Sequence, residues 1–248
     1  MSEKPKLIIP DAGMLMTPRT RRDILKLMAM GGTAVFLPSM MAACSKDKNT
    51  NTVTGPNTGK ALTIDFSKGD FAVLQFAYAL EQLEADFYTR VVAAFSGSNL
   101  SSAEKAILTD IKNHEVIHRE FLKVALGTTY GFTITTSYPN VNFSDRTSVL
   151  NTAASLEETG VKAYNGAAQY LADTGYLLAA GKIVSVEARH ASAINDLLSP
   201  NSSAFAPKAF DDAARPATIA GIAQGFIVDK LGFANAPTTF VPGPNGVV

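Results

Sequence analysis

The chain has 248 residues and carries 22 lysine and arginine residues against 22 aspartate and glutamate residues, so its formal net charge is zero. This balance argues against a nucleic-acid-binding protein, which normally carries a basic excess. With 46% hydrophobic and 18% charged residues, the chain can bury a core. The single cysteine excludes an intrachain disulfide and a zinc site built from cysteines, and there are only three histidines, His114, His118 and His190.

The N-terminal region has the features of an export signal. Residues 20–26 read Thr-Arg-Arg-Asp-Ile-Leu-Lys, which resembles the signature of twin-arginine signals, with Ile24 where phenylalanine is usual. An apolar stretch of about 17 residues follows, from Leu27 to Ala43, and it is short for a membrane span. We therefore predict that residues 1–43 form a signal that is removed on export.

The only cysteine, Cys44, predicts a lipid attachment. It follows Met41-Ala42-Ala43, and this string is similar to the bacterial lipobox, in which the cysteine is lipidated and becomes the new N-terminus. The alternative is an N-terminal membrane anchor with a chance cysteine. Lipidation predicts an exported protein held at a membrane, in the periplasm or cell envelope. Without residues 1–43 the chain has 16 basic against 19 acidic residues, which again does not favour nucleic-acid binding.

The rest of the chain is predicted to contain a tether, a helical domain and an extension. Residues 44–64 are polar and rich in Asn, Thr, Gly and Pro, which predicts a flexible tether. Residues 65–200 form the domain, and a capping box made by Ser101 and Glu104 opens its second helix. We predict helices over about 68–95, 102–126, 145–173 and 175–198.

Two helical pairs joined by a long connection predict an all-α four-helix bundle. Residues 128–146 are rich in threonine, aromatic and β-branched residues and contain a proline, so we expect an extended crossover between the second and third helices. Residues 201–248 are rich in Pro, Gly and Ala. They predict packed coil or a loose tail, with a short helix near 216–224.

Two of the three histidines occur in the same motif, Glu-x-x-His. Glu115 and His118 lie in the second predicted helix, and Glu187 and His190 lie in the fourth. Residues three apart share a helix face, so each motif presents an oxygen and a nitrogen ligand together. One such motif in a helix is common, but the repeated pair is far more specific and indicates a metal site.

The first helix of each pair carries a matching pattern. Leu80-Glu81 and Leu156-Glu157 are each followed by a tyrosine seven residues after the glutamate, Tyr88 and Tyr164. Seven residues make almost two helical turns, so each tyrosine is expected on the same face as its glutamate. The chain thus contains an internal repeat of Glu…Tyr followed by Glu-x-x-His.

These motifs resemble the ferritin-like superfamily, and the phrases LEQLEADFY and LEETGVKAYNGAA make the chain most similar to exported bacterial ferritin-like domain proteins related to desiccation-associated proteins. The resemblance implies a ferritin-like four-helix bundle with a dinuclear site for two Fe or Mn ions. It implies Glu81 and Glu157 as terminal ligands, and Glu115 and Glu187 as bridging ligands. It also implies one nitrogen ligand per metal, from His118 and His190.

Several alternatives stay open at the level of individual residues. If the helix register differs from the one predicted here, Glu84 is the ligand in place of Glu81, or Glu158 in place of Glu157. His114 has no counterpart in the fourth helix, where Val186 takes the matching position, so it is interpreted as a surface residue or a neighbour of the ligands. Tyr88 and Tyr164 are candidates to hydrogen-bond the ligands, or are plain core aromatics.

The function implied by the resemblance is a metal-dependent reaction outside the cytoplasm in stress protection. Ferritin-like sites of this kind oxidise Fe(II) or remove peroxide or O2, and the fold alone does not choose among these substrates. The alternative is a non-catalytic cell-envelope scaffold or binding module with a vestigial metal site. Assembly into a homo-oligomer is compatible with both functions.

Overall fold

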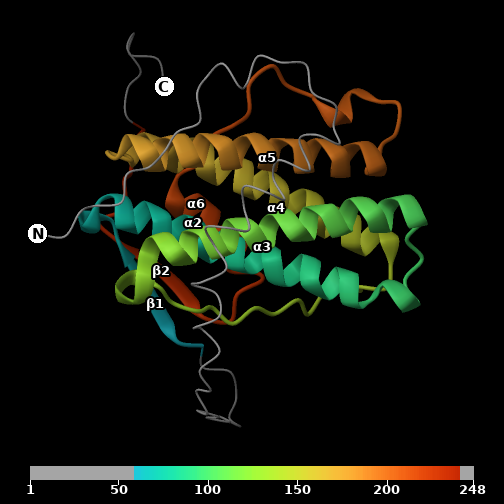
Figure 1. The fold of residues 1–248 in the computed structure, drawn as a ribbon, viewed down its shortest axis with the longest axis horizontal. Helices are drawn as coiled ribbons and strands as arrows, with labels where there is room; N and C mark the ends of the chain where they lie inside the picture. The colour runs from blue at the N-terminus through green and yellow to red at the C-terminus, as the bar shows by residue number, and fades with distance from the viewer. Residues whose placement is uncertain (1–58, 241–248) are drawn as a thin grey trace, which may run out of the picture. The chain divides into compact units, whose positions relative to one another are not determined.

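The computed structural model of the protein describes residues 59–240. The predicted signal, Cys44 and most of the predicted tether lie outside the described residues. The main elements are β1 (Ala61–Asp65), α2 (Asp70–Ala93), α3 (Ser102–Tyr130), α4 (Arg146–Ala167), α5 (Thr174–Leu198), α6 (Pro216–Ala223) and β2 (Lys230–Ala234) (Figure 1).

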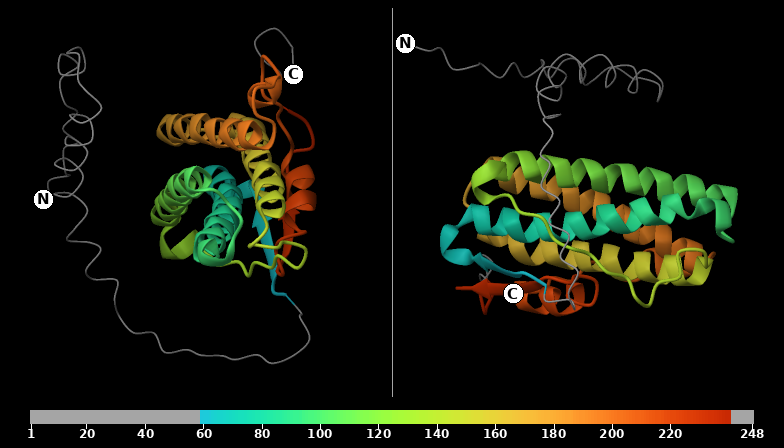
Figure 2. Two further views of the ribbon diagram at one scale, coloured as in Figure 1. Left: turned by 90° about the vertical axis from the view of Figure 1, so that its right-hand side faces the viewer. Right: turned by 90° about the horizontal axis from the view of Figure 1, so that it is seen from below.

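Four long helices form the bundle that the sequence predicts. Helix α2 packs mainly on α3, and α4 packs mainly on α5. Figure 2 shows the four helices grouped around one core, with α6 and β2 on the outside. Leu80, Leu83, Phe87 and Leu156 are among the buried residues of this core. Within residues 59–240, none of the helices combines the length and hydropathy needed to span a bilayer.

Side-chain caps mark the starts of α3, α4 and α5. The hydroxyl of Ser101 accepts a hydrogen bond from the backbone N–H of Glu104, and the Glu104 carboxylate accepts one from the Ser101 N–H. This is the predicted capping box, and it satisfies two amides that a helix start leaves without partners. Asp145 and Asp173 cap the N-termini of α4 and α5 with their carboxylates. Asp145 accepts from the Ser148 N–H, and Asp173 accepts from the N–H groups of Gly175 and Tyr176.

Helix α3 runs further than predicted. The sequence predicts an end at about residue 126, and the helical axis does break at Gly127, whose φ of 59° and ψ of −164° suit glycine best. One more turn follows and ends at Tyr130. Its ring stacks on Phe71 with centroids 4.3 Å apart, and its carbonyl accepts a hydrogen bond from the Gln75 side chain at 2.8 Å. These contacts with α2 hold the extra turn in place.

Helix α4 ends earlier than predicted, at Ala167 rather than near residue 173. A single 3-10 turn follows, and the chain then becomes extended at Leu171. The carboxylate of Asp70, at the start of α2, accepts hydrogen bonds from the backbone amides of Ala172 and Asp173 at 2.7 and 2.8 Å. Because Asp70, about 100 residues away in the sequence, binds these two amides, they do not form the hydrogen bonds that would continue α4.

The connection between α3 and α4 is the predicted long crossover. Thr136 makes an isolated antiparallel bridge with Ile227. Neighbouring backbone hydrogen bonds join Ser137 N to Phe226 O and Val228 N to Thr135 O, both at 2.8 Å. The crossover therefore runs beside the C-terminal extension and is held by it.

The C-terminal extension is packed on the domain through α6 and β2, whereas most of residues 201–213 are exposed. The predicted short helix is present as α6, and Ile219 is fully buried. Strand β2 pairs in parallel with β1, in a register that runs from Ala61 opposite Lys230 to Asp65 opposite Ala234. Residues 61–64, which are predicted to be part of the tether, thus belong to a strand. The partner strand lies about 170 residues away, so no local pattern reveals the pairing.

Candidate metal centre

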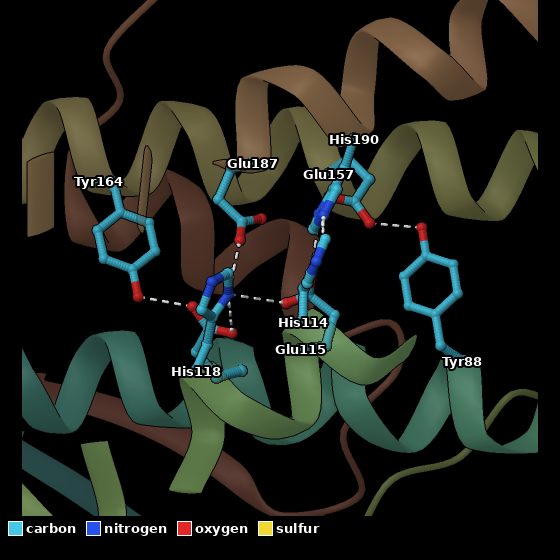
Figure 3. A network of polar contacts seen from close by, with 9 residues as sticks. Tyr88, His114, Glu115, His118, Glu157, Tyr164, Glu187 and His190 are labelled. Carbon is cyan, nitrogen blue, oxygen red and sulfur yellow. Dashed lines mark hydrogen bonds and ion pairs between the residues drawn. The ribbon is translucent and has the colours of Figure 1, made fainter. Parts of the chain in front are cut away.

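All four long helices contribute to a buried cluster of carboxylates and imidazoles (Figure 3). Its six members are the predicted ligands Glu81 of α2, Glu115 and His118 of α3, Glu157 of α4, and Glu187 and His190 of α5. The four glutamates have no exposed surface, and the two histidines are 8% and 5% exposed. The structure therefore brings together every residue of the predicted set.

One half of the cluster is arranged around His118. Its Nδ1 atom lies 3.1 Å from Glu187 Oε1, 3.4 Å from Glu115 Oε2 and 3.5 Å from Glu81 Oε2. These four residues offer one donor atom each, and the donor atoms all lie within 4.8 Å of one another. This spacing is compatible with a single cation between them.

The second half is arranged around His190. Its Nδ1 atom lies 2.9 Å from Glu115 Oε1 and 3.2 Å from Glu157 Oε2. Together with Glu187 these residues form a second group of four donors with the same spacing. Glu115 and Glu187 belong to both groups, which is the arrangement that two bridging carboxylates require.

Hydrogen bonding within the protein leaves the inward-facing atoms unsatisfied. Among residues 59–240, eight buried side-chain oxygen and nitrogen atoms have no hydrogen-bond partner. All eight atoms belong to the six cluster residues. These atoms lie close to one another, but their contacts do not have the directions that hydrogen bonds need. Buried carboxylates without partners are costly. A pair of divalent cations would supply the missing partners, and carboxylate oxygen with imidazole nitrogen suits Fe or Mn.

The cluster residues strongly perturb one another's protonation. Burial, reinforced by the charge of Glu115, raises the pKa of Glu81 to about 7. Burial also raises the pKa of Glu115, but the close contacts with His118 and His190 outweigh burial and leave that pKa at about 2. Burial lowers the pKa of His190, yet contacts with Glu115 and Glu157 outweigh it and raise that pKa to about 9. Without a cation, the cluster therefore retains protons to balance its carboxylates.

Two tyrosines hold the outer oxygens of the terminal glutamates. The hydroxyl of Tyr164 donates to Glu81 Oε1 at 2.6 Å, and the hydroxyl of Tyr88 donates to Glu157 Oε1. Oε2 of each glutamate remains among the unsatisfied atoms that face the cluster. Both tyrosines are therefore hydrogen-bonded to carboxylates of the cluster. Each tyrosine binds the glutamate of the other helical pair, however, and not the glutamate on its own helix.

The structure also decides between the alternative glutamates. Glu158 is exposed, its Oε2 lies 3.5 Å from Lys162 Nζ, and its Oε1 accepts a hydrogen bond from the Asn195 side chain at 3.3 Å. Glu157 is therefore the cluster member on α4. Glu84 is buried in the same core but belongs to neither group of donors. Burial and the charge of Glu187 raise the pKa of Glu84 well above its usual value. Its position three residues after Glu81 is the sequence pattern that indicates this fifth carboxyl group.

A glycine leaves room for these carboxylates. A Cβ atom at Gly160 of α4 would lie 2.9 Å from Glu187 Oε2 and 3.2 Å from Glu84 Oε1. The first distance is shorter than a non-bonded contact allows. The small residue at position 160 is therefore required by the packing of the cluster and not by helix formation.

His114 contacts the cluster from the outside. Its Nδ1 lies 2.9 Å from Nε2 of His190, and the two rings stack with centroids 5.1 Å apart and planes 8° apart. His114 itself is exposed. His114 is therefore both a surface residue and a neighbour of the cluster.

The comparison with protein families agrees with this geometry. A family model described as a ferritin-like domain matches residues 69–200, which make up just over half of the chain. The match covers the four long helices and all six cluster residues. No curated protein matches the chain. The chain therefore belongs to the ferritin-like domain family.

Proposed function

We propose that the protein binds two Fe or Mn ions in the cluster and uses them to oxidise Fe(II) or to remove peroxide or O2 outside the cytoplasm. The observation that carries the proposal is the set of eight buried, unsatisfied donor atoms divided between two groups that share Glu115 and Glu187. Two cations would satisfy both groups of donor atoms. The N–H groups of two imidazoles are too few to satisfy all of the unpartnered carboxylate oxygens.

Each residue has a distinct role in this proposal. Glu81 and Glu157 would be terminal ligands, Glu115 and Glu187 bridging ligands, and His118 and His190 the nitrogen ligands. Redox-active metal bound here would supply electrons to an oxidant such as O2 or peroxide. The hydroxyls of Tyr164 and Tyr88 orient the terminal carboxylates by donating to their outer oxygens. Burial of all six ligands excludes bulk water from the reaction.

The metal proposal is tested by elemental analysis of the protein matured through its own signal. We expect about two Fe or Mn ions per chain, as in other carboxylate-bridged bundles. The variant Glu115→Gln/Glu187→Gln keeps the side-chain volumes but removes both shared carboxylates, so it should lose the metal. Glu158→Gln is the matched control, because Glu158 is exposed on the outer side of α4.

The failure of this test would have a clear meaning. Absence of metal from the wild-type protein, even after reconstitution with Fe(II) and Mn(II), would contradict the proposal. The ferritin-like bundle would then act as the scaffold considered as the alternative. If metal is bound, consumption of O2 and peroxide by the reduced protein identifies the oxidant.

The proposed site of action is the periplasm or cell envelope, with a lipid on Cys44 as the membrane attachment. The support is the twin arginine Arg21-Arg22, the apolar stretch after it and the lipobox-like residues before Cys44. Cell fractionation tests this proposal. Wild-type protein should sediment with membranes and Cys44→Ser should not, whereas an unchanged distribution of the variant would contradict lipid anchoring.

A further inference from the structure

An apolar pocket lies in the bundle core beside the cluster. All four long helices line it, and on each helix a lining residue is one turn from a residue at the cluster. These pairs are Ala77 and Glu81 on α2, Leu122 and His118 on α3, Tyr164 and Gly160 on α4, and Ile183 and Glu187 on α5. Tyr164 belongs to both places, because it lines the pocket and donates to Glu81 at 2.6 Å.

Small side chains create the space. Six alanines line the pocket, namely Ala77, Ala163, Ala167, Ala168, Ala179 and Ala180. The free volume is about 20 Å³. This is somewhat more than the 10–15 Å³ or so that one water-sized molecule requires. The pocket therefore suits a single very small molecule.

The chemistry of the lining disfavours water. Every lining side chain is a hydrocarbon except for the hydroxyl groups of Tyr164 and Tyr176. The Tyr164 hydroxyl already donates its proton to Glu81. A buried water normally makes two to four hydrogen bonds, about three on average, and apolar cavities that lack such partners stay dry and bind nonpolar guests. The preferred occupant is therefore a small nonpolar molecule.

The pocket has an apolar approach from the surface. Phe121 of α3 lines it and is 43% exposed. Ile117 and Val124, four residues before and three residues after it, are 64% and 74% exposed. Residues at this spacing are neighbours on one side of a helix. Three exposed hydrocarbon side chains on α3 thus lie at or next to the pocket lining, where a nonpolar molecule could enter.

We propose that this pocket binds O2 and delivers it past Tyr164 to the carboxylate cluster. The inference rests on the proposed function, because it names O2 as the oxidant that reaches the site through a separate apolar route. Peroxide is polar and forms hydrogen bonds, so it gains nothing from such a route. Filling the pocket should therefore slow the reaction with O2 and spare the reaction with peroxide.

Binding is tested first with xenon, a nonpolar probe that needs no metal. Xenon pressure should shift the methyl NMR signals of Leu122 and Ile183 in the wild-type protein. Ala180→Val and, as a second choice if it misfolds, Ala77→Val should abolish the shifts by filling the space. Ala154→Val is the matched control, because Ala154 is partly buried on α4 and does not line the pocket. Absence of xenon-induced shifts in the wild-type protein would overturn the inference.

Delivery is tested by the kinetics of protein loaded with Fe(II). Ala180→Val should lower the second-order rate constant for O2 several-fold and leave the rate with peroxide unchanged, while Ala154→Val should change neither. Equal slowing with both oxidants, or no slowing with O2, would overturn the proposed route. Failure to bind metal would instead contradict the proposed function, and the xenon experiment would still decide whether the pocket binds a nonpolar molecule.

Discussion

Nδ1 of His114 lies 2.9 Å from Nε2 of His190, whose own Nδ1 faces Glu115 and Glu157. For His190 to bind a metal through Nδ1, its proton must be on Nε2, from which it would donate to His114. Val186 takes the corresponding position in α5, four residues before His190, and a valine cannot accept such a bond. The two halves of the cluster are therefore not equivalent.

His114→Phe is expected to weaken one metal position selectively. Phenylalanine keeps a ring to stack on His190 but removes the nitrogen that orients it. Loss of such an outer partner typically lowers metal affinity about 10–100-fold. Titration of metal-free protein with Mn(II) should show one position weakened and one retained. Asn113→Ala, at an exposed neighbouring position, is the control, and equal weakening of both positions would contradict the assignment.

Tyr164→Phe is expected to destabilise the protein through a carboxylate on another helix. The variant leaves Glu81 Oε1 buried without its 2.6 Å hydrogen bond. An unsatisfied buried acceptor costs about 1–3 kcal/mol in the free energy of unfolding. Urea denaturation of metal-free protein measures this cost. Tyr176→Phe removes another hydroxyl that lines the same pocket and serves as the control, and an equal effect of both changes would argue against a special role for the Glu81 contact.

Gly160→Ala and Gly181→Ala are expected to change stability in opposite directions. A Cβ atom at position 160 would lie 2.9 Å from Glu187 Oε2, whereas a Cβ atom at position 181 would meet nothing within 4 Å. The first change should displace Glu187, lower the metal content and cost about 1–3 kcal/mol in the free energy of unfolding. The second should gain up to about 1 kcal/mol from helix propensity. Thermal unfolding and elemental analysis of both variants check this contrast.

Stability of the metal-free protein is expected to fall as pH rises from about 5 to about 9. The pKa of Glu81 is raised from 4.5 to about 7, so its contribution is full below 4.5 and is lost as pH rises through 7. The pKa of His190 is raised from 6.5 to about 9, so its contribution is lost as pH rises through 9. The pKa of Glu115 is lowered to about 2, so its contribution is lost only in acid.

Bound metal should reverse this dependence, because the metal replaces the protons and requires deprotonated ligands. The stabilisation by metal should therefore be larger at pH 8 than at pH 6, where protons compete for the same atoms. Urea denaturation with added Mn(II) or with a chelator, at each pH, measures the difference. A metal-free protein that is more stable at pH 9 than at pH 6 would contradict the expected protonation of the cluster.

The sequence alone determined the features that depend on helical periodicity and local capping. Ser101 and Glu104 mark the start of α3 because a capping box involves only neighbouring residues. Glu115 with His118 and Glu187 with His190 share helix faces because residues three apart always do. With the matching position of Glu81 and Glu157, these local rules indicated a helical bundle with a metal site, while the full set of six residues was implied by the resemblance to the ferritin-like superfamily and Glu84 and Glu158 stayed open as alternatives.

The way in which separate helices complete one another depends on tertiary packing. Periodicity predicts that Tyr88 and Tyr164 share a helix face with the glutamates of their own helices, but it does not reveal that each donates to the glutamate of the other pair. The contact of His114 with His190 and the pairing of β1 with β2 likewise join segments far apart in the sequence. Such contacts depend on how helices and strands pack in three dimensions, and the periodicity of one helix contains no information about its neighbour's position.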